Sequence, residues 1–248
     1  MQDFQPSPQA LANKTILGTG AGDGIGKEAA VTFAKYGATV ILLGKTTQKL
    51  EAVYDLIVAA GYPEPAIVPL DLNGATKKHY QDMASTIKAE FGKLDGVLHN
   101  AGMLGVLTPF EHIDLETWQK ILQVNLTSAM LMTQALLPVM ALAPHASLVF
   151  TSSGVGRNGR AYWGAYSVSK FGTEGLMQLI ADEYETSTIR TNCINPGATR
   201  TKMRTAAYPG ENQLTLKTPA DLMPLYLYLM SDESIGVNGQ SLDAQAKK

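Results

Sequence analysis

The sequence predicts an α/β fold: one domain with a doubly wound, mainly parallel sheet covered by helices on both faces, in three layers α/β/α. Three observations predict it. Short apolar runs alternate with longer helical patterns, glycines follow the helical runs, and five glycines lie between Gly18 and Gly26, at the first expected strand-to-helix turn. A length of 248 residues with 45% apolar residues suits a single domain of this kind.

The expected elements follow one another in strict alternation. Strands alternating with helices of this length form right-handed βαβ units, and such units build a parallel sheet. Three helical runs end before Gly37, Gly61 and Gly92, where a left-handed C-cap residue is needed, and Asp114 precedes another run as an N-cap. The expected strands are 15–18, 39–43, 66–69, 94–99, 147–152 and 189–195; the expected helices are 24–36, 48–60, 76–91, 115–140 and 163–185.

The domain is expected to span residues 14–248, after a polar N-terminal tail at residues 1–13 that does not resemble a signal peptide. Residues 199–218 lack a strong period and carry Pro209 and Gly210. This segment is therefore interpreted as a substrate loop, or as short helices, that can move over a site.

Composition limits the partners. With 20 Lys plus Arg against 22 Asp plus Glu, the net charge is −2, so no basic field attracts nucleic acid or an anionic membrane. The most membrane-like stretch, 124–143, is interrupted by polar residues and fits a buried helix better than a span. The single cysteine, Cys193, excludes an internal disulfide and fits a cytoplasmic protein, as a small buried residue rather than a nucleophile. The four histidines show no ligand spacing, so no metal site is expected.

Tyr166 and Lys170 carry the strongest chemical signal. They lie one helical turn apart on one face, and Ser153 lies thirteen residues before the tyrosine. An adjacent ammonium is expected to lower the tyrosine pKa from about 10 toward neutrality, where a general acid/base works best. The same pair also occurs in helices where the lysine is solvated and the tyrosine covers a core. A serine hydrolase is poorly supported, because Ser153 lacks the leading glycine of a nucleophile elbow.

The glycine-rich turn suits a phosphate, because glycines let the backbone approach a pyrophosphate at the start of a helix. Tight packing is the other interpretation of such a turn. The second strand ends without the carboxylate that would bind the ribose of NAD, and Lys45 stands there instead. A cation at this place favours NADP(H), with NAD(H) still possible; alternatively Lys45 is a solvated surface lysine.

Taken in order, these motifs resemble the classical short-chain dehydrogenase/reductase family, and within it the bacterial YciK-type oxidoreductases. The resemblance covers nearly the whole chain and implies a Rossmann-like fold. It is carried by the motif Thr19-Gly20-x-x-x-Gly24-Ile25-Gly26, by Leu70-Asp71-Leu72, Asn100-Ala101-Gly102, Asn125, Ser153 and Tyr166-x-x-x-Lys170, and by Asn195-Pro196-Gly197 with Thr201.

The resemblance implies roles at matching positions. Asp71 would bind the adenine amine and Leu72 would contribute a backbone contact, although Leu72 and Ala101 are equally explained as strand-end residues. Asn125 would support a water that links Lys170 to solvent, or would be an ordinary buried amide. The implied catalytic residues are Asn125, Ser153, Tyr166 and Lys170. The cofactor-binding candidates are Gly20, Asp23, Gly24, Ile25, Gly26, Lys45, Asp71, Leu72, Asn100, Ala101, Gly102, Tyr166, Lys170, Pro196, Gly197 and Thr201.

Two departures from the family pattern are expected to leave the chemistry unchanged. His99 stands where the family often has asparagine, and is interpreted as a structural imidazole. The C-terminal segment 238–244 resembles the last strand of the family but lacks the usual glycine pair after Asp243.

The predicted function is NADP(H)-dependent interconversion of a carbonyl and a secondary alcohol, with Tyr166 as general acid/base. The alternatives are a cofactor-binding regulatory or structural protein, and an epimerase or dehydratase that uses the same tyrosine and lysine. The expected partner is a small-molecule substrate, and the resemblance implies a homodimer or homotetramer paired through the long helices. Arg157, Arg160 and Arg204 near the expected pocket suggest an anionic substrate, or else surface and intersubunit pairs.

Overall fold

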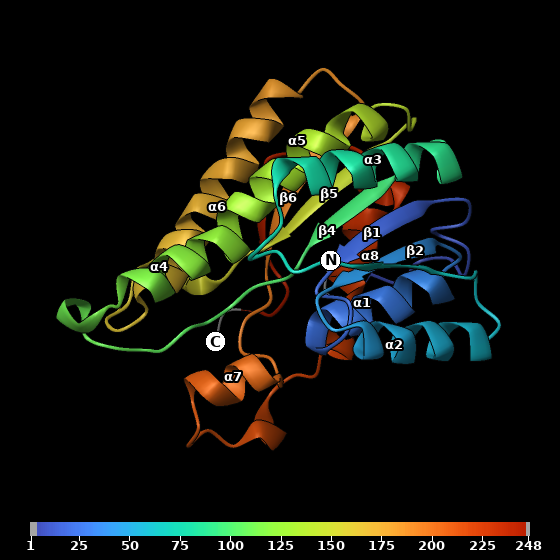
Figure 1. Cartoon of the computed structure of the whole chain (residues 1–248). Helices are drawn as coiled ribbons and strands as arrows, with labels where there is room; N and C mark the ends of the chain where they lie inside the picture. The colour runs from blue at the N-terminus through green and yellow to red at the C-terminus, as the bar shows by residue number, and fades with distance from the viewer. Residues whose placement is uncertain (1–3, 247–248) are drawn as a thin grey trace.

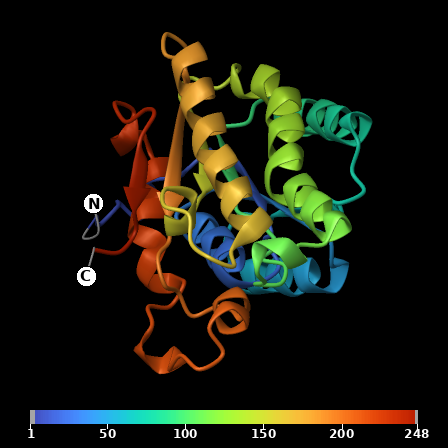
Figure 2. The same cartoon turned by 90° about the vertical axis from the view of Figure 1, so that its left-hand side faces the viewer.

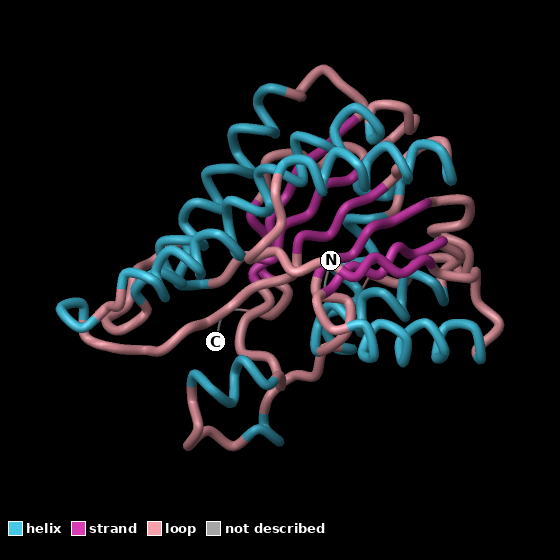
Figure 3. Tube along the Cα trace, viewed as in Figure 1, coloured by secondary structure: helices cyan, strands magenta, loops and turns pink. Residues whose placement is uncertain are grey.

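The computed structural model describes residues 4–246, and its centre is a seven-stranded sheet between two layers of helices (Figures 1 and 3). Every neighbouring pair of strands is parallel. The strand order is β3-β2-β1-β4-β5-β6-β7, which confirms the predicted doubly wound fold. The strands are β1 (Thr15–Thr19), β2 (Thr39–Gly44), β3 (Ala66–Pro69), β4 (Gly96–His99), β5 (Ala146–Thr151), β6 (Ile189–Asn195) and β7 (Ser241–Asp243).

Helices cover both faces of the sheet. On one face lie α1 (Gly24–Lys35), α2 (Thr47–Ala59) and α8 (Met223–Met230); on the other lie α3 (Lys77–Phe91), α4 (Leu115–Leu122), α5 (Ser128–Met140) and α6 (Gly164–Glu183). The short helix α7 (Lys202–Ala207) stands outside both layers, and Figure 2 shows its segment projecting from the rest of the domain. Within residues 4–246, none of the helices has the length and apolar character needed to cross a membrane.

Two hydrophobic cores, one on each face, hold the layers together. Successive residues of β1 alternate between them: Ile16 packs with α1, α2 and α8, and Leu17 packs with α3, α5 and α6. This alternation follows from the period of two along a strand. Because the strands are buried on both faces, they consist of nearly continuous apolar runs.

The strand order places a crevice at one edge of the sheet. The chain leaves β1 toward β2 on one side, and β4 is added on the other side of β1. Ligands of open α/β sheets bind at this switch point, outside the carboxyl ends of the strands. The glycine-rich turn after β1 and the segment after β4 both lie there.

The predicted helix 115–140 is interrupted. A π-helical turn, Gln123–Thr127, separates α4 from α5. The Asn125 side chain at this turn accepts a hydrogen bond from Met103 N (2.7 Å) and donates one to Met103 O (2.9 Å). At this wider turn, the Asn125 side chain therefore holds the helix against the segment after β4. π-Turns of this kind often mark functional sites.

Other differences lie near the chain ends. The segment expected to be a tail packs on the domain, since Leu11 is fully buried and Phe4 makes an edge-on contact with Tyr228. Helix α8 was not predicted, whereas the short helix α7 lies inside the segment 199–218 that was interpreted as a loop or short helices. The predicted caps are confirmed: Gly37, Gly61 and Gly92 all have positive φ, and Asp114 accepts from Thr117 N.

Candidate active site

Ser153, Tyr166 and Lys170 line one cavity of about 330 Å³ at the carboxyl edge of the sheet. Ser153 follows β5, and the other two lie on α6, one turn apart. The α6 helix brings its first turns to the end of β5 because Ser167 donates to the carbonyl of Val155, within the turn that follows Ser153. The structure thus brings together the serine, phenol and ammonium that the sequence singled out.

The phenol of Tyr166 is buried, and this raises its pKa to about 12, although a hydrogen bond with Ser153 acts in the opposite direction. The expectation that Lys170 lowers this pKa toward neutrality is therefore wrong for the protein as the structure shows it. The reason is geometric: the ammonium donates to the carbonyl of Thr151 (2.7 Å) and lies 5.7 Å from the centre of the Tyr166 ring. Desolvation of the phenolate outweighs the remaining attraction.

Lys170 is itself buried, with only 5% of its surface exposed. Burial lowers its pKa to about 8, and Cys193 and Glu174 act in the opposite direction. Near neutral pH the ammonium is therefore charged inside an environment that penalises charge.

Asn125 uses its side chain within the protein. Besides its two bonds to Met103, its amide nitrogen donates to Ser169 (3.0 Å), the residue before Lys170. This arrangement matches the alternative of an ordinary buried amide bonded to backbone, while the implied link from Lys170 to solvent stays a prediction. Asn125 and Lys170 both border a small void behind the cavity.

The glycine-rich turn is shaped for close backbone approach. Gly20 and Gly24 have φ of +67° and +55°, which disfavour any side chain. A Cβ on Gly26 would lie 2.3 Å from the carbonyl oxygen of Gly20, so α1 begins in direct contact with the turn. Asn100 helps fix this contact by donating to Thr19 O (3.3 Å). The turn and helix start present the cradle that a pyrophosphate requires.

Asp23 joins three segments at this turn. Its carboxylate accepts from Gly24 N and pairs with Lys49 of α2 and Lys202 of α7, each at 2.8 Å. Hydrogen bonds from Lys202 and then Lys49 hold the pKa of Asp23 well below its ordinary value. Asp23 was predicted from the sequence, but its two lysine partners, which come from segments distant in the chain, were not.

A second cavity, of about 270 Å³, continues along the edge toward β2 and β3 and shares Gly20, Asp23, Ala101 and Gly102 with the first. Because they share these residues, the two cavities form one trough along the carboxyl edge of the sheet. The predicted residues divide between them. The first cavity is lined by Gly20, Asp23, Gly24, Ile25, Asn100, Ala101, Gly102, Tyr166, Lys170, Pro196, Gly197 and Thr201, and the second also by Lys45, Asp71 and Leu72. Gly26 lines neither and acts through packing.

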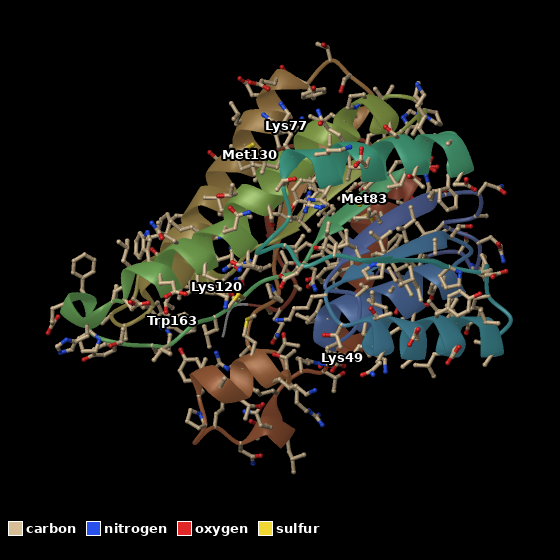
Figure 4. All side chains as sticks on the ribbon, in the orientation of Figure 1. Lys49, Lys77, Met83, Lys120, Met130 and Trp163 are labelled. Carbon is tan, nitrogen blue, oxygen red and sulfur yellow. The ribbon has the colours of Figure 1, made fainter. Side chains whose placement is uncertain are left out.

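Lys49 and Trp163 stand at different ends of this trough. Lys49 lies at the start of α2 and borders the second cavity, whereas Trp163 precedes α6 and borders the first (Figure 4). Thr46 also lines the second cavity, beside Lys45. The sequence carries a second lysine, Lys49, four residues after Lys45 at the start of the expected helix 48–60, and this second cation near the end of β2 was a signal that could have been used.

A buried polar network supports the wall behind Ser153. Ser152 and Ser241 both donate to Glu174, and Arg157 lies 3.5 Å from the same carboxylate. The network continues toward the other side of the cavity: Arg157 Nη1 pairs with Asp243 (2.6 Å), which also accepts from Asn195 Nδ2 (2.8 Å). The last strand is thus connected to the elements that carry Ser153 and Gly197. Arg157, Asn195 and Asp243 were named from the sequence, but Glu174, the partner of Ser152, was not.

His99 and Cys193 have the structural roles expected of them. The His99 ring is buried, bonds to Thr133 (2.9 Å) and stacks on Phe150, and burial lowers its pKa to about 3. Cys193 is also buried, which raises the pKa of its thiol. In the described part of the chain, no group of three or more His, Cys, Asp or Glu residues could hold a metal ion.

Known proteins share this sequence and fold. The short chain dehydrogenase family model matches residues 14–212. The oxidoreductase YciK of Escherichia coli K12 is 51% identical over 98% of this chain and 96% of its own length. A Shigella flexneri short chain dehydrogenase in complex with NADP has 50% identity and a TM-score of 0.95, covering 97% of this chain and 100% of that one. An Escherichia coli CFT073 short chain dehydrogenase in complex with NADPH has 51% identity, a TM-score of 0.95 and the same coverage. This protein belongs to the short-chain dehydrogenase family of oxidoreductases.

Proposed function

We propose that this protein is an NADP(H)-dependent oxidoreductase that interconverts a carbonyl and a secondary alcohol, with Tyr166 as the general acid/base. The observation that carries the proposal is that Ser153, Tyr166 and Lys170 line the same cavity as the glycine-rich cradle. Two similar proteins of known structure hold NADP and NADPH.

The trough fits a dinucleotide along its length. The turn Gly20–Gly26 would hold the pyrophosphate, Asp71 and Leu72 the adenine, and Asn100–Gly102 the adenosine ribose. Pro196, Gly197 and Thr201 would border the nicotinamide, and Lys170 its ribose. The nicotinamide supplies the hydride that reduces the carbonyl carbon, or accepts it in the reverse direction.

Tyr166 is suited to donate a proton. Because burial keeps its pKa near 12, the phenol is protonated at neutral pH and can transfer its proton to the carbonyl oxygen. Ser153 hydrogen-bonds to the same oxygen, and the charged Lys170 stabilises the phenolate that remains.

The second cavity supports the preference for NADP(H). Lys45, Thr46 and Lys49 line it at the end of β2, where a ribose 2′-phosphate would lie. Lys45 is exposed, and the ion pair of Lys49 with Asp23 is solvent-accessible and therefore weak. Both lysines can reorient toward a phosphate.

Tyr166→Phe tests the proposal. With NADPH and a panel of aldehydes and ketones, the variant should lose at least about a thousandfold in kcat, because the proton donor is absent, yet bind NADPH with nearly unchanged affinity. Tyr62→Phe, a partly buried tyrosine away from the cavity, is the matched control. Retention of most of the rate by Tyr166→Phe refutes the assignment of the acid. Product formed without net NADPH consumption would instead indicate an epimerase.

We also propose that the chain forms a homodimer or homotetramer in the cytoplasm, through α4 and α6. Val168, Phe171 and Leu179 are 46%, 46% and 54% exposed, and their spacing places them along one stripe of α6. Leu115 at the start of α4 is 68% exposed. Apolar side chains exposed along neighbouring helices are typical of a surface that pairs with a second copy.

A further inference from the structure

Beyond the candidate cofactor residues and Ser153, the first cavity is lined by the polar residues Thr151, Ser152, Thr199, Lys202 and Arg204. Its remaining lining residues, Leu104, Trp163, Met203 and Ala207, are apolar. They come from the segment after β4, the residue before α6, and α7. A substrate carbonyl held by Ser153 and Tyr166 would place the rest of its molecule against these residues.

Trp163, which lines the cavity, belongs to a row of aromatic rings that begins with Tyr166 and continues to Tyr208, outside the cavity lining. The Trp163 ring lies 5.6 Å from the Tyr166 ring and 6.0 Å from the Tyr208 ring, tilted to both. Tyr208 follows α7 and in turn stacks under the guanidinium of Arg204, at 3.8 Å. Rings at such distances offer a flat apolar molecule a broad contact surface.

The cations that line the cavity all have other partners. Arg204 donates from Nε and Nη2 to the two oxygens of Glu211, each at 2.6 Å, in the bidentate geometry that binds carboxylates best. Lys202 pairs with Asp23, and Lys170 is buried against the Thr151 carbonyl. The two other arginines that the sequence suggested for an anionic substrate lie outside the cavity lining and also have partners: Arg157 pairs with Asp243, and Arg160 donates to the Tyr208 hydroxyl at 3.4 Å.

Glu211 therefore takes up the Nε and Nη2 donors of Arg204 that a substrate carboxylate would need. An anionic substrate would have to displace Glu211 from Arg204 or lie beside its negative charge, and neither is required of a neutral molecule. Arg204 is the one arginine that lines the pocket, and Glu211 both neutralises its charge and accepts its hydrogen bonds.

We propose that this pocket takes uncharged, apolar ring ketones, aldehydes and the corresponding alcohols, and that Glu211, by holding Arg204, excludes substrates that carry a carboxylate. The proposal rests on the proposed function for the reaction, but it assigns a substrate class and a specificity residue of its own. On this proposal, the arginines near the pocket pair within the protein and do not bind an anionic substrate.

Paired substrates test the proposal. The two members of each pair differ only by a carboxylate: one pair is acetophenone and para-acetylbenzoate, the other benzaldehyde and para-carboxybenzaldehyde. The kcat/KM of each compound is measured with NADPH. The wild type should prefer the neutral member of each pair by about tenfold or more, and Glu211→Gln should raise the relative kcat/KM of the carboxylate by about tenfold. In the double variant Arg204→Gln with Glu211→Gln, the gain should disappear, because no cation remains to be released.

Glu90→Gln, an exposed glutamate on α3 at the other edge of the sheet, is the matched control and should leave the ratio unchanged. A wild type that prefers the carboxylates overturns the proposal, as does a ratio that Glu211→Gln leaves unaltered.

A binding measurement separates this proposal from the proposed function. In a Trp118→Phe background, Trp163 is the remaining tryptophan, and its fluorescence reports on the pocket directly. Benzamide should quench it saturably and benzoate should not, whereas Glu211→Gln should restore benzoate binding. If no compound of the panel is reduced but this pattern holds, the proposed function fails and the pocket assignment stands. If benzamide does not bind, or benzoate binds the wild type equally well, the pocket assignment fails.

Discussion

Replacing Lys170 by methionine should abolish activity and yet stabilise the fold at neutral pH. Keeping the buried ammonium charged is costly: a pKa lowered from 10.5 to about 8 corresponds to roughly 3 kcal/mol at pH 7. Methionine has a similar length and no charge, so this cost disappears. The variant loses the hydrogen bond to Thr151 O, which is worth about 1 kcal/mol. The net gain in the free energy of unfolding should be about 1–2 kcal/mol.

The stability difference between Lys170→Met and the wild type should depend on pH. The folded-state pKa of Lys170 lies below the unfolded value, so between pH 8 and about 10.5 the unfolded chain binds more protons than the folded one. The wild type therefore gains stability through this window while the methionine variant does not. The advantage of the variant should shrink as the pH rises above 8 and should be absent by about pH 10.

Urea unfolding of both proteins at pH 7 and pH 10, followed by circular dichroism, measures the difference. Lys78→Met, an exposed lysine of α3 paired with Asp82, is the control, and its stability should stay within about 0.5 kcal/mol of the wild type at both pH values. A Lys170→Met variant that is less stable than the wild type at pH 7 refutes the reasoning. So does an advantage that is the same at both pH values.

Three further predictions concern the cofactor site and the assembly. Gly26→Ala should weaken NADPH binding at least about a hundredfold, because the new methyl meets a carbonyl oxygen of the turn. The control Gly74→Ala places its methyl where nothing lies within 4 Å and should bind NADPH normally, and fluorescence titration with NADPH measures both affinities. Lys45→Asp should change the ratio of NADPH to NADH affinity by about tenfold or more in favour of NADH, with Lys77→Asp as control, and an unchanged ratio would show that Lys45 is only a surface lysine. Phe171→Glu should yield monomers in sedimentation velocity, because a charge then lies in the proposed helix interface; an unaltered sedimentation coefficient contradicts the assignment of that surface.

The sequence predicted the elements that carry a clear period. Strand bounds agree within one or two residues, and the catalytic groups converge because their motifs lie at strand ends and on one helix face. Helix α8 escaped prediction because its sequence, Met-Pro-Leu-Tyr-Leu-Tyr-Leu-Met, is apolar almost throughout. A helix buried in this way has no polar face to reveal a period of 3.6.

The contacts that define the site electrostatically could not be predicted. Lys202 reaches Asp23 across 179 positions of the chain, and its partner is set by how α7 folds back over the cavity. The Tyr166 pKa was expected to fall because spacing alone places an ammonium nearby. Spacing does not reveal that the ammonium is bonded to the Thr151 carbonyl, nor how deeply the phenol is buried.

The far end of the polypeptide underpins the reaction although it touches none of the reacting atoms. Ser241 and Asp243 tie β7 to Arg157 and Asn195, and Gln245 donates to the carbonyls of Pro196 and Ala198, at 2.8 and 3.0 Å. A protein truncated just before Ser241 would therefore keep Ser153, Tyr166 and Lys170, but the segments on both sides of the crevice would lose these hydrogen bonds. Six strands of the sheet would remain, and the catalytic side chains would no longer be held in position.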